Sequence, residues 1–172
     1  ADKRTDTERK RAYNSSNRAL YVRVRELTEE FYKSLIGKEN VTLLFNKTYQ
    51  LLQVASAAIV TSGTATLETA LLYVPEVICY KGNPISYRIA KNLIKIKYIC
   101  LVNLIMDKPV VKELIQDDLT PENIKSELDQ LLTNPRKQRE ILEDYDELRH
   151  VLGNAGASDN AASIIVSDLK KK

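Results

Sequence analysis

From residue 41 onward, short apolar runs alternate with longer amphipathic stretches. The runs are rich in β-branched and aromatic residues, begin 16 to 21 residues apart, and cover 41–45, 57–60, 77–80 and 98–102. This spacing leaves room for one short helix per crossover, and continuous apolar strands are typical of a parallel sheet that is covered on both faces. The pattern therefore predicts an α/β fold with a Rossmann-like parallel sheet flanked by helices.

The segments between and after these runs show helical periodicity. Helices are expected over 20–36, 48–55, 64–73 and 86–95. After Asn103 the pattern is helical only. It comprises a short amphipathic piece over 109–116, a helix capped by Thr120 with Pro121 in its first turn, a helix from Pro135 to about Leu148, and a final helix that carries Ala161–Leu169. The sheet is therefore expected to carry an all-helical tail.

Composition and charge limit the organisation of the chain. With 172 residues, 44% of them hydrophobic, the sequence can bury one substantial core. We divide it into a basic segment over 1–26, a sheet-containing domain over 27–153, and a carboxyl-terminal helix with a basic tail over 154–172. The first 17 residues of the basic segment show no apolar periodicity. The chain begins at Ala1 without a methionine, which predicts an excised or processed piece of a longer protein.

Basic residues gather at both ends, although the net charge is only +3. Solvated ends account for this charge, and the functional alternative is a basic arm that meets nucleic acid or anionic lipid headgroups. Because aromatic interleaving and nucleic-acid motifs are absent from the sequence, we expect no nucleic-acid partner. Cys79 and Cys100 lie in apolar runs and are expected to be buried free thiols. The sequence contains no run of about 18 apolar residues, so it predicts no membrane-spanning helix.

The segment Thr61–Glu68 is the strongest candidate for a ligand site. It follows an apolar strand, precedes an apolar helix, and concentrates hydroxyls and Gly63 where the first N–H groups of the helix lack intrahelical partners. Thr64 and Glu68 stand four residues apart and share one helix face, so a carboxylate would lie just behind a bound phosphate. This arrangement indicates a nucleotide or nucleotide-sugar site. A capped strand-to-helix turn is the simpler alternative.

The ends of the next two predicted strands supply further candidates. Tyr80 follows the third strand and could stack on a base, although such tyrosines are often interface residues. Asn103 follows the fourth strand, where a turn residue that bonds its own backbone is the usual alternative. For Glu68 the alternative is a first-turn carboxylate that the helix dipole favours. The amphipathic segment 86–97 is expected to be a crossover helix and the start of the next strand, with a membrane-surface face as its alternative.

Other chemistries find little support in the sequence. His150 is the only histidine and lies on a charged helix, so histidine-based acid–base catalysis and histidine-rich metal sites are not expected. The sequence contains no nucleophile elbow, P-loop, dinucleotide fingerprint or Cys-x-x-Cys pair. We therefore expect no metal and no cofactor.

Taken as a set, the central motifs resemble a known family. Asn46–Leu52 reads Asn-Lys-Thr-Tyr-Gln-Leu-Leu, Ala57–Glu68 reads Ala-Ala-Ile-Val-Thr-Ser-Gly-Thr-Ala-Thr-Leu-Glu, and Val74-Pro75, Tyr80, Tyr98–Asn103 and Val111–Gln116 follow. This string closely resembles the carboxyl-terminal domain of the lipid-A-disaccharide synthase family, from about Leu27 to about Ile165. The resemblance implies a GT-B glycosyltransferase whose second Rossmann-like half binds the nucleotide sugar.

The resemblance also implies a reaction and a site. Enzymes of that family transfer 2,3-diacylglucosamine from UDP to 2,3-diacylglucosamine 1-phosphate with inversion and without a catalytic metal, at the cytoplasmic face of the inner membrane. Carried over, it makes the residues that contact the diphosphate Ser62, Gly63, Thr64 and Ala65. Glu68 would bind the ribose, and Tyr80 and Asn103 would line the donor pocket.

The resemblance has departures. The family's amino-terminal half, with its proposed catalytic base and acceptor site, and the first strand of its second half find no counterpart in residues 1–26. The chain alone is therefore expected to be inactive, and an open sheet edge invites pairing, with residues 1–26 or with a second copy in a homodimer as the alternatives. Two alternatives stay open at this point, namely a non-catalytic nucleotide-sensing or interaction module and a UDP-sugar epimerase-like protein. The string Thr48–Leu52 and the region of Asn103 argue against the epimerase.

Overall fold

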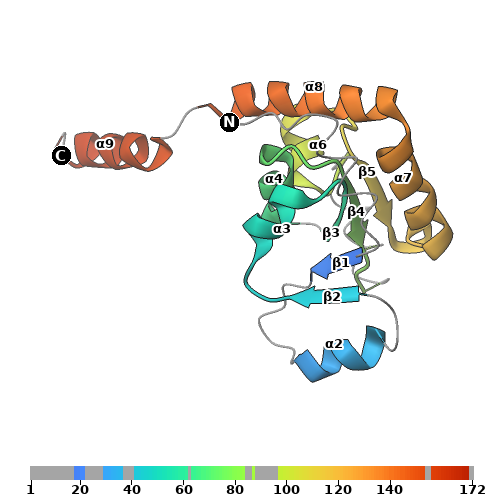
Figure 1. The fold of residues 1–172 in the computed structure, drawn as a ribbon. Helices are drawn as coiled ribbons and strands as arrows, with labels where there is room; N and C mark the ends of the chain where they lie inside the picture. Colours follow the sequence, from blue (N-terminus) through green and yellow to red (C-terminus); the bar gives the residue numbers. More distant parts are fainter. Residues whose placement is uncertain are drawn as a thin grey trace.

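The computed structural model describes residues 18–21, 29–36, 41–61, 63–83, 87, 97–153 and 156–170. The described strands form two parallel sheets (Figure 1). The smaller sheet pairs β1 (Arg18–Tyr21) with β2 (Val41–Leu44), and α2 (Glu29–Ile36) lies between them in the chain. The larger sheet has the order β3 (Ala58–Thr61), β4 (Glu76–Tyr80) and β5 (Lys112–Ile115).

The larger sheet organises the core. Ala58 lies opposite Glu76 and Thr61 opposite Cys79 in the β3–β4 register, and Tyr80 lies opposite Ile115 in the β4–β5 register. The first four residues of β4 are buried, as expected for a central parallel strand that is covered on both faces. In β3, by contrast, Val60 is buried and Ile59 is 49% exposed. Within the described residues no strand pairs with the other edge of β3.

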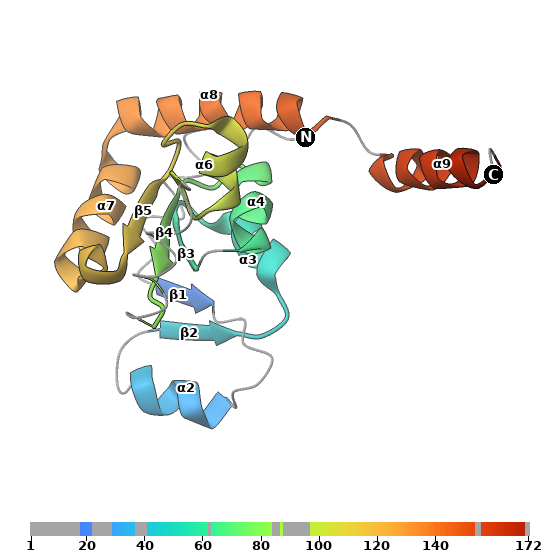
Figure 2. The same cartoon turned by 180° about the vertical axis from the view of Figure 1, so that it is seen from behind.

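Helices cover this sheet on several sides. The helices on either side of β3 in the chain, α3 (Thr48–Val54) and α4 (Thr64–Leu71), lie to one side of the sheet (Figures 1 and 2). At the other side, α7 (Pro121–Thr133) packs on β4 and β5. Two further helices, α6 (Leu101–Met106) and α8 (Pro135–Leu152), pack on each other and on α4. The hydroxyl of Tyr145 donates to the carbonyl of Val74 at 3.3 Å, which ties α8 to the amino-terminal end of β4.

The last described helix, α9 (Ala157–Leu169), extends away from the rest of the fold (Figures 1 and 2). All of its residues are exposed, including Ile164 at 70%. Among the described residues, no helix combines the length and the apolar character that crossing a membrane requires.

The structure confirms the predicted α/β fold, with a Rossmann-like parallel sheet flanked by helices and a helical carboxyl-terminal segment. The strands predicted near 41, 57 and 77 and the helices predicted from 48, 64 and 135 are present. Thr120 caps α7 as predicted, because its hydroxyl oxygen accepts a hydrogen bond from the N–H of Asn123 at 3.2 Å. The predicted helix 86–95 lies outside the described residues apart from Tyr87.

Three local predictions are wrong. Residues 98–102 form no strand, because α6 begins at Leu101, and the third strand of the large sheet is β5, inside the segment expected to be helical over 109–116. The Glu113 carboxylate explains why β5, and not 98–102, is the third strand. It accepts hydrogen bonds from the N–H groups of Ile99 and Cys100, just before α6, where a helix start needs partners. Similarly, Leu20 and Tyr21 belong to β1 and not to a helix, since β1 pairs with β2.

Candidate functional site

The carboxyl ends of the three larger-sheet strands lie at one edge, which is where open α/β sheets bind ligands. Thr61 ends β3, Tyr80 ends β4 and Ile115 ends β5. The segments that follow begin with Gly63 and α4 after β3, and with Lys81 and Gly82 after β4. The structure thus places the predicted strand ends at 61 and 80 on neighbouring strands.

Gly63 makes the sharp corner between β3 and α4. Its φ of 140° and ψ of −166° fall in a region that is essentially restricted to glycine. A Cβ built on Gly63 would meet no atom within 4 Å, so glycine is needed for its backbone conformation and not to avoid crowding. Ser62, the residue before it, lies outside the described residues.

The first turn of α4 presents the backbone groups that could hold an anion. Gly63 is the N-cap and offers no side-chain hydrogen bond to the helix. The first N–H groups of a helix have no intrahelical partner, and the helix dipole is positive there. Thr64 is exposed and Ala65 is half-buried, so this turn is accessible from solvent. The corner can therefore face a phosphate group through its backbone.

Glu68 lies one helical turn beyond Thr64 in α4, which confirms that one helix carries both residues. Its side chain is half-buried, whereas Thr69 and Ala70 face the core with exposures of 2% and 1%. The carboxylate thus lies on a side of α4 that solvent reaches. Its role as a ribose partner stays a prediction.

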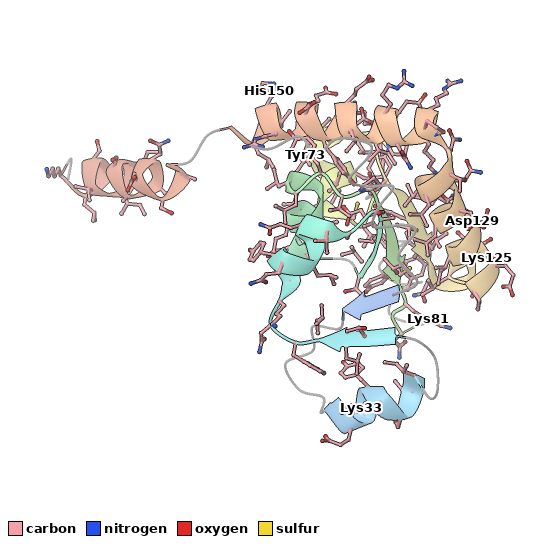
Figure 3. All side chains as sticks on the ribbon, viewed as in Figure 1. Lys33, Tyr73, Lys81, Lys125, Asp129 and His150 are labelled. Carbon is pink, nitrogen blue, oxygen red and sulfur yellow. The ribbon has the colours of Figure 1, made fainter. Side chains whose placement is uncertain are left out.

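Tyr80 lies at the same edge of the sheet and is 38% exposed. Its ring packs over Gly82, where an added Cβ would stand 3.1 Å from the tyrosine hydroxyl. Gly82 therefore leaves room for the ring to fold back over the chain. The sequence analysis gave Gly82 no role of its own. Figure 3 places Lys81 at this end of the sheet and His150 at the far end of α8.

Asn103 occupies a different setting from the one expected. It lies in α6, is 1% exposed, and bonds the backbone of Val111 in both directions: its amide nitrogen donates to the carbonyl at 2.9 Å and its oxygen accepts from the N–H at 3.0 Å. The amide nitrogen also donates to Glu113 at 3.1 Å. These bonds occupy the side chain and join α6 to the start of β5. Its predicted place in a ligand pocket stays untested.

Glu113 and Gln116 are notable polar residues that the sequence analysis did not assign to a role. Glu113 caps α6 and orients Asn103, and a carboxylate on a distant strand gives no local sequence signal for this. Gln116 follows β5 with a φ of 52°, and its amide nitrogen is buried without a hydrogen-bond partner. A non-glycine residue in this conformation is uncommon. It stands directly after Ile115, the neighbour of Tyr80 in the sheet.

The remaining titratable groups lie away from the corner or are inert. Burial raises the pKa of Cys100 to about 12, and burial also raises the pKa of the Cys79 thiol. Both cysteines are free and buried, as predicted, and such thiols are poor nucleophiles. Glu76 is completely buried at the opposite end of β4, where burial raises its carboxyl pKa well above 4.5.

His150 is exposed, as the sequence analysis expected. Across the described ranges, no group of three or more His, Cys, Asp or Glu side chains is placed to hold a metal ion. A polar recess between β5 and α7 contains none of the predicted site residues. It is lined by Lys112, Leu114, Asp118, Asn123, Ser126 and Glu127.

Comparison with known proteins agrees with these motifs. The family model described as lipid-A-disaccharide synthetase matches residues 8–166, a range that includes residues 8–26, which the resemblance left unmatched. The lipid-A-disaccharide synthase of Syntrophus aciditrophicus is 40% identical over 148 residues, which are 84% of this chain and 39% of that protein. That of Geobacter sulfurreducens is 36% identical over 133 residues, covering 77% of this chain and 35% of that protein.

A third relative gives the same picture. The lipid-A-disaccharide synthase of Gloeothece citriformis is 41% identical over 127 residues, which are 73% of this chain and 33% of that protein. The chain thus spans between a third and two fifths of the length of these relatives. Because the family model matches residues 8–166 and these relatives are 36–41% identical over 73–84% of the chain, the chain belongs to the lipid-A-disaccharide synthetase family.

Proposed function

We propose that this chain is the donor-binding part of a lipid-A-disaccharide synthase. In this proposal it binds UDP-2,3-diacylglucosamine, and the transfer of the sugar to 2,3-diacylglucosamine 1-phosphate inverts the anomeric centre and releases UDP. The family membership and the names of the relatives support an enzyme that builds a lipid A disaccharide. The observation that carries the donor assignment is the glycine-specific corner at Gly63, which exposes the first turn of α4 at the carboxyl edge of the sheet.

Each part of the corner has a proposed role. The backbone at Ser62, Gly63, Thr64 and Ala65 binds the diphosphate. Glu68 accepts hydrogen bonds from the ribose hydroxyls, since it lies one turn behind the first residue of α4 and is open to solvent. Tyr80 flanks the pocket from the neighbouring strand. We do not include Asn103 as a direct donor contact, because α6 buries it and its polar atoms bond Val111 and Glu113.

The corner also has a role in the chemical step that we propose. Negative charge grows on the departing UDP as the bond to the sugar breaks. Fixed backbone N–H groups and a helix dipole that already point at the diphosphate stabilise this charge without having to reorganise. The same groups that bind the donor would thus lower the barrier to its cleavage.

Transfer is proposed to need more than this chain. A base must be positioned against the acceptor hydroxyl, and none of the titratable groups at the corner is assigned to that task. The chain covers only about two fifths or less of the length of its relatives. Within the described part, β3 has an unpaired edge and Ile59 is 49% exposed beside it. We propose that further chain, or a second copy, covers this edge and completes the enzyme.

The substrates also bear on localisation. A donor and an acceptor that each carry two acyl chains are lipids, so we propose that the protein works on the cytoplasmic face of the inner membrane as a peripheral protein. Basic residues at both ends of the sequence fit an anionic surface.

Calorimetric titration with UDP tests the donor assignment. Wild-type protein should bind UDP, and Glu68→Ala should weaken binding by about tenfold or more, because hydrogen bonds to a charged partner contribute about 1.5–3 kcal/mol. Glu122→Ala is the matched control, since Glu122 is an exposed first-turn carboxylate on α7. Equal affinities of wild type and Glu68→Ala would remove the ribose assignment.

A turnover assay tests the second half of the proposal. With UDP-2,3-diacylglucosamine and the acceptor, the chain alone should release no disaccharide. Clear formation of the disaccharide would show that the chain carries its own base and acceptor site. Failure of the wild-type chain to bind UDP would instead contradict donor binding itself.

A further inference from the structure

Two threonines on the buried side of α4 make similar hydrogen bonds to different positions of the backbone, one at the helix start and one inside the helix. Thr66 is 0% exposed and its hydroxyl donates to the carbonyl of Gly63 at 2.8 Å. Thr69 is 2% exposed and its hydroxyl donates to the carbonyl of Ala65 at 2.8 Å. Threonines within helices commonly bond carbonyls three or four residues earlier. The acceptor of Thr66 is special, because it belongs to the corner residue.

The bond from Thr66 fixes one peptide plane. The carbonyl of Gly63 accepts from the hydroxyl of Thr66 and also from its backbone N–H at 3.2 Å, so this oxygen points along α4. The Gly63–Thr64 peptide bond is trans, and the carbonyl and the N–H of a trans peptide point in opposite directions. The N–H of Thr64 therefore points out of the helix start, toward the space in front of the corner.

This plane would otherwise be weakly constrained. Gly63 has no side chain, caps the helix without a side-chain bond, and meets no atom within 4 Å of its Cβ position. Glycine also has more backbone freedom than any other residue. The hydroxyl of Thr66 thus adds a side-chain bond, from the core, to the backbone bond that already holds the corner carbonyl.

We propose that Thr66 is a positioning residue, whose hydroxyl orients the Thr64 N–H toward the diphosphate of the bound nucleotide. This inference rests on the proposed function and adds to it a buried residue that touches no ligand. Thr69 supplies the comparison, because it has the same residue type, a similar burial and a bond of the same length, but its acceptor lies inside the helix. If both bonds had a purely structural role, loss of either hydroxyl would have the same effect on UDP affinity.

Three variants separate these roles. Thr66→Val removes the hydroxyl and keeps the branched shape, Thr66→Ser keeps the hydroxyl, and Thr69→Val is the matched control. Calorimetry would measure the affinity of each for UDP and for uridine, and thermal unfolding would measure stability. Because the Thr64 N–H meets the diphosphate, Thr66→Val should weaken UDP binding by about five- to tenfold and leave uridine binding within twofold, as expected when a polar contact to an anion is misaligned. Thr66→Ser and Thr69→Val should bind UDP like wild type.

The outcomes are distinguishable. Equal losses of UDP affinity in Thr66→Val and Thr69→Val, or an equal loss for UDP and uridine in Thr66→Val, would overturn the positioning role and leave the proposed function standing. Wild-type protein that binds UDP no more tightly than uridine would refute the diphosphate site, and the role of Thr66 with it. If Thr66→Val does not fold, Thr66→Ala and Thr69→Ala give the same comparison without the added methyl group.

Discussion

Glu76 makes the stability of this protein depend on pH in a direction that the structure sets. Its side chain is 0% exposed, and both carboxyl oxygens are buried without a hydrogen-bond partner. Burial is the cause that raises its pKa well above 4.5. Among the described residues, Tyr145 of α8 and Cys100 at the start of α6 interact electrostatically with Glu76, and burial raises the pKa of both so that they stay neutral. We expect Glu76 to be a neutral acid in the folded protein.

The direction in which the free energy of unfolding changes with pH follows from proton binding. Above an unfolded pKa of about 4.5, the unfolded chain releases the proton of Glu76 while the folded chain keeps it. The folded state then binds more protons, so the free energy of unfolding falls as pH rises until the pH reaches the raised pKa of the buried group. Each pH unit in this window costs about 1.4 kcal/mol. Below the unfolded pKa the full stability is present.

Urea unfolding of wild type and Glu76→Gln between about pH 5.5 and pH 7.5 measures this effect. Glutamine keeps the shape of a neutral glutamic acid but does not titrate. The difference in unfolding free energy between the two proteins should grow in favour of Glu76→Gln by up to about 2.7 kcal/mol across these two pH units, with no change in the dependence on urea. The control is Glu143→Gln, at an exposed position of α8, which should follow wild type at every pH. Parallel pH profiles of wild type and Glu76→Gln would refute a neutral, buried Glu76.

Three further predictions concern the corner, the α6–β5 junction and the thiols. Gly63→Ala should cost about 1–3 kcal/mol of stability through backbone strain and should abolish measurable UDP binding, whereas unchanged calorimetry and denaturation would contradict the assigned backbone geometry. Asn103→Ala leaves the buried N–H and carbonyl of Val111 unpaired and should lower the unfolding free energy by about 2–4 kcal/mol, against no measurable effect for exposed Asn160→Ala on α9. Cys79 and Cys100 should not react with a thiol reagent in the folded protein at pH 8 and should both react in denaturant; labelling of native Cys100 would contradict its burial and its pKa of about 12.

Local sequence patterns predicted the elements whose causes are local. The strands near 41, 57 and 77 are apolar runs, and α7 and α8 begin where Thr120 and Asn134 cap a helix with a proline in its first position. The exchange of 98–102 for 112–115 had no such cause. The run 98–102 is apolar, whereas 112–115 carries the charged Lys112 and Glu113, and the choice of strand depends on the bonds from the N–H groups of Ile99 and Cys100 to the Glu113 carboxylate. A contact between elements far apart in the chain leaves no mark in either local pattern.

The candidate site divides in the same way. The turn at Gly63 and the shared helix of Thr64 and Glu68 followed from residue type and spacing, and the structure contains both. The setting of Asn103 did not follow, because its interpretation depended on the missing fourth strand. The bond from Thr66 to Gly63 was also beyond the pattern, since spacing indicates which carbonyls a threonine can reach but not which one it bonds.

The unpaired edge of the larger sheet belongs to β3, and the Gly63 corner follows the same strand. In doubly wound sheets the ligand binds where the strand order reverses. The described order β3, β4, β5 follows the chain without a reversal, and no described strand pairs with the other edge of β3, beside the Gly63 corner, so we expect the reversal at that edge. In a full-length relative, a strand paired there would end next to the proposed diphosphate site and would add its contacts to those of the described residues. We therefore expect this chain to bind UDP more weakly than a full-length relative does. The factor lost on replacing the glutamate at the position of Glu68 by alanine should be similar in both proteins, because α4 supplies that contact by itself. A much larger loss in the relative than in this chain would show that the ribose contact depends on the added strand and is not built by α4 alone.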